Sequence, residues 1–202
     1  MKVHPTAEVE DGVSIGDGTA IWSRVHLRSG AVIGRDCIVG ESTYIAGDVL
    51  VGDRVKINAM AYLCAGVTIE DGVMVSAGVI FTNDRYPRAT TPDLAELRPS
   101  DLGDHTLLTR VREGATIGAG SIVGCGLEVG RFALVGMGSV VTRSVPDFHL
   151  VVGNPARSIA AVCRCGEPVA RFSTGAPADV DATCPACSRR YTIRQKRVEE
   201  VT

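Results

Sequence analysis

The sequence predicts an all-β solenoid, a parallel β-helix of hexapeptide repeats with an extruded loop and a small C-terminal four-cysteine module. Three observations predict this fold. A large apolar residue recurs every six positions from Val9 to Phe81 and again from Val111 to Val141. Glycine is frequent, at 23 of 202 residues, and often follows these positions directly. Aromatic residues make up only 4% of the chain, which is few for the core of a compact α/β domain.

The period of six matches neither the 3.6-residue period of a helix nor the two-residue period of a long strand. It fits short straight edges joined by corners, because a small or branched residue such as Thr19 or Cys37 follows four residues after each large one. Three such edges close a triangular coil of about eighteen residues, and stacked coils pair strands at about 4.8 Å. Glycine near the corners is expected to supply positive φ and close backbone approach. The alternative is a β-sandwich with accidental spacing, but sandwich strands drift in length.

The repeats are interrupted once. Residues 9–81 give about four coils and residues 111–145 about two more. Residues 82–110 between them contain prolines and charges but no apolar hexad. A polar loop of this length inside a compact repeat is usually functional or disordered, and the regular core around it favours function.

The end of the chain changes character. Residues 146–157 are expected to leave the coil after Val145, and the segment from Cys163 onward is rich in cysteine with a basic run. We therefore predict a β-helix domain over residues 1–157 and a separate tail over residues 158–202.

Composition excludes several partners. With 21 Lys and Arg against 23 Asp and Glu, the net charge of −2 leaves no electrostatic footprint for nucleic acid and no polybasic membrane-binding cluster. No run of 18 apolar residues is present, and the first residues lack the pattern of an export signal. The seven cysteines are then expected to be thiols or metal ligands in a cytoplasmic protein.

The segment Gly153-Asn154-Pro155-Ala156-Arg157 closes the repeats. Gly153 and Pro155 shape a rigid turn, and the planar guanidinium of Arg157 suits a phosphate. With the hexads, this segment resembles the left-handed β-helix acyltransferases. The resemblance implies a left-handed helix, acetyl-coenzyme A as acyl donor at residues 146–157, and a homotrimer with sites between subunits. The expected cofactor-binding residues are Ala119, Gly136, Gly138, Gly153, Asn154, Pro155 and Arg157. The alternative reading of this segment is a proline-fixed cap on the solenoid.

The segment FTNDRYPRA, residues 81–89, opens the loop. It resembles one subgroup of these enzymes, the N-acetyltransferases that act on the 3-amino group of nucleotide-linked amino sugars. The resemblance implies that Asn83 lies near the acceptor amine, with Asp84 beside it. An amide orients a neutral amine without adding charge, and Arg85 and Arg88 suit a sugar carboxylate or a diphosphate. The alternative is a loop exit fixed by Asn and Pro turn chemistry.

Acyl transfer from this site needs an acceptor for the amine proton. His105 in the loop is the natural general base by residue type, whereas His4, His26 and His149 are expected to be structural. In the subgroup, the leaving thiolate has been proposed as the final proton acceptor, so both routes stay open.

The tail carries a metal-binding pattern. Cys184 and Cys187 have the spacing of a zinc knuckle, and Cys163 and Cys165 supply two more thiolates at a spacing one residue shorter than usual. A structural zinc ion would staple a segment that has little apolar core. The alternative is four free cysteines in a disordered tail.

Together these features predict an enzyme that transfers acetyl from acetyl-coenzyme A to an amino group, expected at C3, of a UDP- or dTDP-linked amino sugar. As in the family, it would serve surface polysaccharide, lipopolysaccharide or glycoside biosynthesis. One alternative is an acyltransferase of this fold with another small acceptor, and a second is a non-catalytic trimeric scaffold. A carbonic anhydrase of this fold would need three histidines on neighbouring coils, and only His26 lies on a predicted coil.

Overall fold

A computed structural model describes residues 1–99, 103–172 and 179–201 of the chain. Residues 100–102 of the predicted loop, and 173–178 and 202 of the predicted tail, lie outside the described residues. Every regular element of the described residues is a strand, and the strands form four sheets. No helix in this part of the chain is long and apolar enough to cross a membrane.

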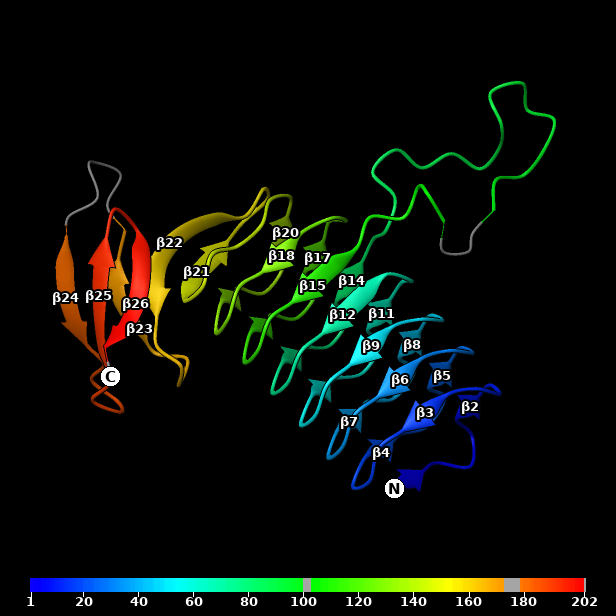
Figure 1. The fold of residues 1–202 in the computed structure, drawn as a ribbon, viewed down its shortest axis with the longest axis horizontal. Coiled ribbons are helices and arrows are strands. Elements are labelled where there is room, and N and C mark those ends of the chain that lie inside the picture. Colours follow the sequence, from blue (N-terminus) through cyan, green and yellow to red (C-terminus); the bar gives the residue numbers. More distant parts are fainter. Residues whose placement is uncertain (100–102, 173–178, 202) are drawn as a thin grey trace.

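Three sheets form the sides of the solenoid, and successive strands pass from one side to the next (Figure 1). The ten-stranded sheet contains β1 (Lys2–Val3), β4 (Ala20–Ile21), β7 (Ile38–Val39), β10 (Lys56–Ile57), β13 (Met74–Val75), β16 (Thr116–Ile117), β19 (Leu134–Val135), β21 (His149–Val152), β22 (Arg157–Val162) and β23 (Pro168–Arg171). The seven-stranded sheet contains β2 (Glu8–Val9), β5 (His26–Leu27), β8 (Tyr44–Ile45), β11 (Tyr62–Leu63), β14 (Ile80–Phe81), β17 (Ile122–Val123) and β20 (Val140–Val141). The six-stranded sheet contains β3 (Ser14–Ile15), β6 (Val32–Ile33), β9 (Leu50–Val51), β12 (Val67–Ile69), β15 (Thr109–Val111) and β18 (Glu128–Val129).

The register confirms the triangular coil. Lys2 pairs with Ala20 and Lys56 with Met74, so equivalent residues of neighbouring coils are 18 positions apart. Ile80 pairs with Ile122 instead, an offset of 42, so the inserted loop adds 42 − 18 = 24 residues. The insertion lies between β14 and β15, as the break in the hexads predicts.

The core is a column of apolar side chains along the axis of the solenoid. The predicted large residues such as Leu27 and Ile45 are 0% exposed, and the small partners such as Val49 are equally buried. Each buried large side chain contributes about 1.5–3 kcal/mol through the hydrophobic effect. Polar members of the column are satisfied, since the Thr19 hydroxyl donates to the Gly34 carbonyl over 2.7 Å.

The structure corrects the expected role of one set of glycines. Positive φ falls on the third residue after the large apolar one, as at Met60 (φ 60°) and Gly78 (φ 67°), and not on the glycine that directly follows it. A Cβ added to Gly34 would lie 2.3 Å from the Gly52 carbonyl oxygen of the next coil. These directly following glycines therefore permit close stacking of the backbone, which is the other predicted role, and the positive-φ prediction for them is wrong.

The solenoid is longer at both ends than the hexads indicate. Eight strands of the ten-stranded sheet, from β1 to β21, are parallel and stacked. The prediction that the chain leaves the coil after Val145 is wrong, because Leu150 pairs in parallel with Leu134 and continues the stack. The chain reverses only after Val152, and β22 then returns antiparallel to β21.

The loop and the tail occupy different parts of the molecule (Figure 1). The loop projects sideways from the stack between β14 and β15, and a small hairpin forms within it, where the Thr91 amide donates to the Glu96 carbonyl over 2.9 Å. The tail lies at the end of the solenoid opposite the N-terminus. There β22 and β23 extend the ten-stranded sheet, and β24 (Val180–Thr183), β25 (Arg190–Arg194) and β26 (Arg197–Val201) form a separate antiparallel sheet.

The tail packs on the last coil through a second apolar cluster. Phe148 of the coil stacks on Phe132 and meets Tyr191 of β25 edge-on, with ring centroids 5.6 Å apart in each pair. The buried ring of His149 uses both nitrogens, with Nδ1 2.8 Å from the Ser158 hydroxyl and Nε2 2.7 Å from the Lys196 carbonyl. Burial lowers the pKa of His149, which indicates a neutral, structural ring.

Candidate functional site

A cleft of about 540 Å³ lies at the base of the loop. It follows the corner between the seven-stranded and six-stranded sheets and includes part of the outer face of the seven-stranded sheet. The cleft brings together Asn83, Asp84 and His105, the three predicted catalytic residues. The other described residues that line it are Glu10, Arg28, Ser29, Tyr44, Ala46, Gly47, Asp48, Tyr62, Cys64, Ala65 and Pro99.

The loop base positions these residues. Asn83 lies two residues beyond β14, and its backbone carbonyl accepts a hydrogen bond from the Leu107 amide over 2.9 Å. This bond closes the loop and places His105, two residues before Leu107, on the same cleft. Asp84 accepts from the Tyr86 amide over 2.8 Å, and its other oxygen lies 3.7 Å from the Arg98 guanidinium. The half-buried side chains of Asn83 and His105 are thus held at the entrance and the exit of one loop.

An aromatic ladder that the sequence analysis missed forms one wall of the cleft. Tyr44 and Tyr62 pair in register on neighbouring strands, and their rings stack with centroids 5.2 Å apart and an interplanar angle of 8°. His26, on the preceding coil, meets Tyr44 edge-on at 5.3 Å. Positions 26, 44 and 62 are 18 residues apart, so the coil period together with aromatic residue type was the available signal.

A charged pair lies beside this ladder. The Arg28 Nε atom is 2.6 Å from Glu10 Oε1, and Arg28 Nη1 donates to the Tyr44 hydroxyl over 3.0 Å. Glu10 also accepts from the Ser29 amide over 2.9 Å and lies 2.9 Å from His26 Nε2. The Ser29 amide, followed by the Arg28 and His26 side chains, lowers the pKa of Glu10 to about 2. The carboxylate is therefore ionised at every working pH.

The two arginines expected to bind substrate lie elsewhere on the loop. Arg88 donates to the Pro87 carbonyl over 2.8 Å and lines a separate hollow of about 430 Å³ with Arg98. Arg85 is exposed and is not among the described residues that line the cleft. The roles predicted for Arg85 and Arg88 stay predictions.

The residues expected to bind the cofactor gather at the C-terminal end of the solenoid. Ala119 and Gly138 lie in successive turns at the corner between the ten-stranded and seven-stranded sheets, where the Gly138 amide donates to the Ala119 carbonyl over 2.8 Å. The turn at Gly153 sits on the same corner, because the Val140 amide donates to the Gly153 carbonyl over 3.0 Å. The Gly153 amide donates in turn to the buried Ser139 hydroxyl over 3.2 Å.

The remaining members of this set surround that turn. Asn154 and Pro155, joined by a cis peptide bond, are exposed at its tip, and Arg157 is exposed at the start of β22. Gly136 is different, since a Cβ added there would lie 2.7 Å from Val152 Cγ1. Space outside Gly138 is open, with nothing within 4 Å of an added Cβ. This corner and the cleft thus lie along opposite edges of the seven-stranded sheet.

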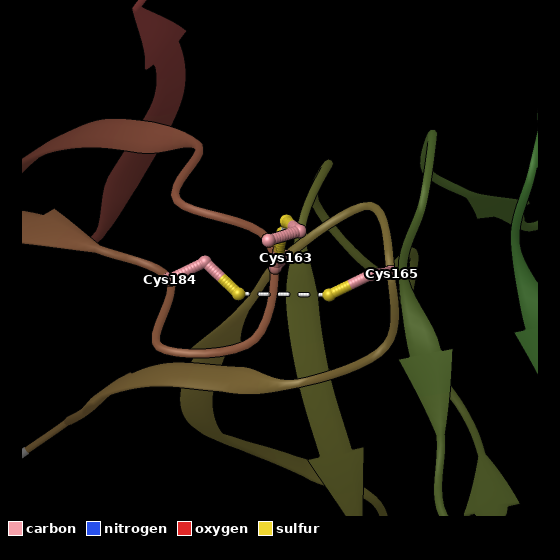
Figure 2. A group of neighbouring side chains, drawn as sticks. Cys163, Cys165 and Cys184 are labelled. Atoms are coloured by element: carbon pink, nitrogen blue, oxygen red, sulfur yellow. Dashed lines mark hydrogen bonds between the residues drawn. The ribbon is translucent and has the colours of Figure 1, made fainter.

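The tail cysteines converge as the zinc prediction requires. The ligand atoms of Cys163, Cys165, Cys184 and Cys187 all lie within 4.8 Å of one another. Sγ of Cys163 is 3.4 Å from Sγ of Cys187, and Sγ of Cys165 is 3.5 Å from Sγ of Cys184, the pair joined by the dashed line in Figure 2. Four thiolates at Zn–S distances of about 2.3 Å around a tetrahedral ion need sulfur separations of this order, so the residues fit the metal.

The knuckle is supported by its surroundings. The Tyr191 hydroxyl, buried beneath the cluster, donates to Cys163 Sγ over 3.1 Å, and the Ser188 amide bonds to the Cys184 carbonyl. Cys163 directly follows β22, so the strand that begins at Arg157 ends at the cluster. The other three cysteines, Cys37, Cys64 and Cys125, are buried on the coils.

Comparison with known sequences identifies the repeats. Residues 12–47 match the family described as bacterial transferase hexapeptide (six repeats), and residues 48–83 and 109–143 match the hexapeptide repeat of succinyl-transferase. The dTDP-3-amino-3,6-dideoxy-alpha-D-galactopyranose 3-N-acetyltransferase of Aneurinibacillus thermoaerophilus is 39% identical over 189 residues, covering 94% of this chain and 89% of that protein. The chain belongs to the hexapeptide-repeat transferase family. The predicted fold class, an all-β left-handed parallel β-helix, is confirmed.

Other members of the hexapeptide-repeat transferase family match less completely. The bifunctional protein GlmU of Rubrobacter xylanophilus is 28% identical and covers 84% of this chain, which spans only 42% of that protein. Among solved structures, a variant of AntD, an N-acyltransferase from Bacillus cereus, crystallised with dTDP and coenzyme A, superimposes with a TM-score of 0.64. It is 22% identical, and the match covers 75% of this chain and 84% of AntD, so it supports the fold.

Proposed function

We propose that this protein transfers an acetyl group from acetyl-coenzyme A to the 3-amino group of a UDP- or dTDP-linked amino sugar. The observation that carries the proposal is the cleft at the loop base, which gathers Asn83, Asp84 and His105. The relative from Aneurinibacillus thermoaerophilus, similar over 94% of this chain, is a 3-N-acetyltransferase of a dTDP-linked amino sugar. A cleft of about 540 Å³ has the size of a small-molecule site.

The reaction needs a neutral amine held against the thioester carbonyl. In our proposal the Asn83 side-chain carbonyl accepts a hydrogen bond from the sugar amine and turns its lone pair toward the acyl carbon. The new C–N bond forms, the C–S bond breaks, and coenzyme A leaves as a thiolate. Asp84, fixed by the Tyr86 amide and Arg98, keeps the segment beside Asn83 in place.

We propose that His105 accepts the amine proton. Its half-buried ring lies on the same cleft as Asn83, and imidazole has the ordinary pKa best suited to this task near neutral pH. Replacement His105→Gln is expected to lower kcat about 100-fold and to remove the acidic limb of the pH–rate profile. An unchanged kcat and profile would assign the proton to the leaving thiolate instead.

The cofactor is proposed to bind along the corner that carries Ala119, Gly138 and the Gly153 turn. Small residues at this corner leave the backbone accessible to a pantetheine arm, and the exposed guanidinium of Arg157 can pair with a phosphate. Gly136, packed under Val152, would support this surface from beneath.

We propose a homotrimer that completes the site. In one chain the acceptor cleft and the cofactor corner lie on opposite edges of the seven-stranded sheet, so a neighbouring subunit must bring the second half. Mixing Asn83→Ala and Arg157→Ala subunits during refolding is expected to restore activity, because some interfaces then contain both intact halves. Sedimentation as a monomer, or failure of the mixture to regain any activity, would contradict this arrangement.

A structural zinc ion is proposed for Cys163, Cys165, Cys184 and Cys187. When bound, the ion cross-links the chain directly after β22 to the knuckle before β25. We further propose that residues 158–202 act as a capping unit and that the enzyme works in the cytoplasm on precursors of surface polysaccharides, lipopolysaccharides or glycosides. Cysteines free of disulfides among the described residues support a reducing compartment.

The test is a thiol-release assay with acetyl-coenzyme A and a panel of UDP- and dTDP-linked 3-amino and 4-amino sugars. Thiol release with a 3-amino sugar, falling about 100-fold or more in Asn83→Ala, is the expected result. Lys56→Ala, on the outer face of the ten-stranded sheet, serves as the matched control and is expected to retain full activity. Release with only simple amines or 4-amino sugars would overturn the proposed acceptor.

A further inference from the structure

The cleft contains a single fixed guanidinium. Among the described residues that line it, Arg28 is the one Arg or Lys, whereas Glu10, Asp48 and Asp84 are acidic. An anionic substrate entering this acidic cleft needs a cation to receive it, because unpaired like charges in a partly buried site are mutually unfavourable. Arg28 is the residue that meets this need.

Arg28 is held in one orientation by two different contacts. Its Nε lies 2.6 Å from Glu10, and its Nη1 donates to the Tyr44 hydroxyl over 3.0 Å. The carboxylate of Glu10 is itself anchored by the Ser29 amide over 2.9 Å. Within the described part of the chain, Nη2 has no hydrogen-bond partner, so one end of the fork is available to a ligand.

The neighbouring ladder gives this guanidinium a rigid floor. Tyr44 stacks on Tyr62 with a centroid separation of 5.2 Å, and Tyr62 remains 44% exposed. A stacked, in-register pair on two strands of the solenoid moves little, so the Tyr44 hydroxyl is a fixed point. Arg28 is therefore preorganised, and less conformational entropy is lost when it binds.

We propose that Arg28 is a specificity-determining residue that binds an oxyanion of the nucleotide sugar, with Tyr44 as its positioning residue. The shared chemistry is a planar fork on paired oxygens, which a diphosphate or a hexuronate carboxylate both supply. This inference rests on the proposed function and names the group of the substrate that the cleft reads. It differs from the roles predicted for Arg85 and Arg88, neither of which lines the cleft.

The first experiment compares steady-state kinetics of wild type, Arg28→Gln and Tyr44→Phe with the nucleotide amino sugar that the panel identifies. Arg28→Gln is expected to raise KM for the sugar about 10- to 100-fold, the range for a lost charge-assisted hydrogen bond. KM for acetyl-coenzyme A is expected to stay within about twofold. Tyr44→Phe keeps the stacked ring and removes the hydroxyl, so a rise of about 3- to 10-fold in the same KM is expected.

Controls separate recognition from folding. Arg54→Gln removes another paired surface arginine, held 3.1 Å from Asp71 and outside the cleft, and is expected to change neither KM. Arg28→Lys retains the charge but not the fork, so its KM for the sugar is expected to lie between those of wild type and Arg28→Gln. If Arg28→Gln loses its cooperative thermal transition, the folded Arg28→Lys variant decides the matter by the same two KM values.

Two arms distinguish the source of the oxyanion. Calorimetric titration with free dTDP and UDP tests the diphosphate, and turnover with amino hexuronates beside 6-deoxy amino sugars tests the carboxylate. Weaker nucleotide binding by Arg28→Gln assigns the diphosphate, and a loss confined to hexuronates assigns the carboxylate.

The outcomes keep this inference distinct from the proposed function. Nucleotide binding that is weakened by Arg28→Gln would support the role of Arg28 even if no sugar were acetylated. Unchanged KM for the sugar and unchanged nucleotide affinity in Arg28→Gln would overturn that role while leaving the acetyl transfer intact.

Discussion

Replacement of Gly34 by alanine tests how the coils are stacked. Gly34 follows the buried Ile33 directly, and its φ is not positive, so alanine strains no dihedral angle there. The added Cβ would instead lie 2.3 Å from the carbonyl oxygen of Gly52 and 2.5 Å from its carbonyl carbon. Both are backbone atoms of the next coil and have no rotamer by which to move aside.

The magnitude follows from this overlap. Ordinary van der Waals contact begins near 3.4 Å, so the two coils must separate by about 1 Å at this corner. The backbone bonds from Gly34 to Val51 and from Gly52 to Ile69, each 2.8 Å long, lie across the same interface. Weakening both costs about 1–2 kcal/mol, and overpacking adds about 1–3 kcal/mol. For a chain of this size, a loss near 3 kcal/mol lowers Tm by about 6–12 °C.

Thermal unfolding followed by circular dichroism measures this loss. Gly72→Ala is the matched control, because Gly72 has φ 66° and an added Cβ would have nothing within 4 Å. Its cost is the left-handed backbone alone, about 1–2 kcal/mol. Gly34→Ala is therefore expected to unfold at the lower temperature. Equal Tm values for the two variants, or a Gly34→Ala protein within about 2 °C of wild type, would refute the reasoning.

Three other predictions follow from the C-terminal half. Arg157→Ala is expected to raise KM for acetyl-coenzyme A about tenfold with kcat unchanged, measured by thiol release; an effect on kcat alone would contradict a phosphate contact. Removal of metal by a strong chelator is expected to speed hydrogen exchange in β24–β26 and leave the coils protected, with one zinc per chain detected beforehand by elemental analysis; a metal-free protein with full protection would refute the zinc site. Because burial lowers the pKa of His149, the unfolded chain takes up the proton first, so this stabilisation is complete above about pH 6.5 and is lost as the pH falls toward the folded pKa. The difference in Tm between pH 7 and pH 5 is expected to shrink in His149→Gln, and an unchanged difference would contradict a neutral buried ring.

The hexads predicted the coils because each edge of the triangle needs the same two inward residues. That requirement repeats along the sequence, and the loop at 82–110 was visible as the place where it stops. The ends of the solenoid were harder to predict. Val9 is 38% exposed at the open N-terminal end, and β21 is covered by β22 and the tail, so neither end shows the inward pattern of a central coil.

The site was predictable only in part, since its residues come from two kinds of signal. Asn83, Asp84 and His105 belong to one loop, and a local motif reveals them. Arg28, Tyr44 and Tyr62 face outward from separate coils, where the hexad pattern imposes no residue type. They become neighbours only when positions 18 residues apart are compared, which requires the coil length that the structure supplies.

The most direct test of the proposed chemistry is identification of the product. Purified protein, acetyl-coenzyme A and a dTDP- or UDP-linked 3-amino sugar are incubated together, and the sugar product is resolved by mass spectrometry and proton NMR. The account predicts a gain of one acetyl group, attached through an amide at C3, in step with thiol release. Unmodified sugar at the end of the incubation, or acetyl carried as an ester on a hydroxyl group, would contradict it.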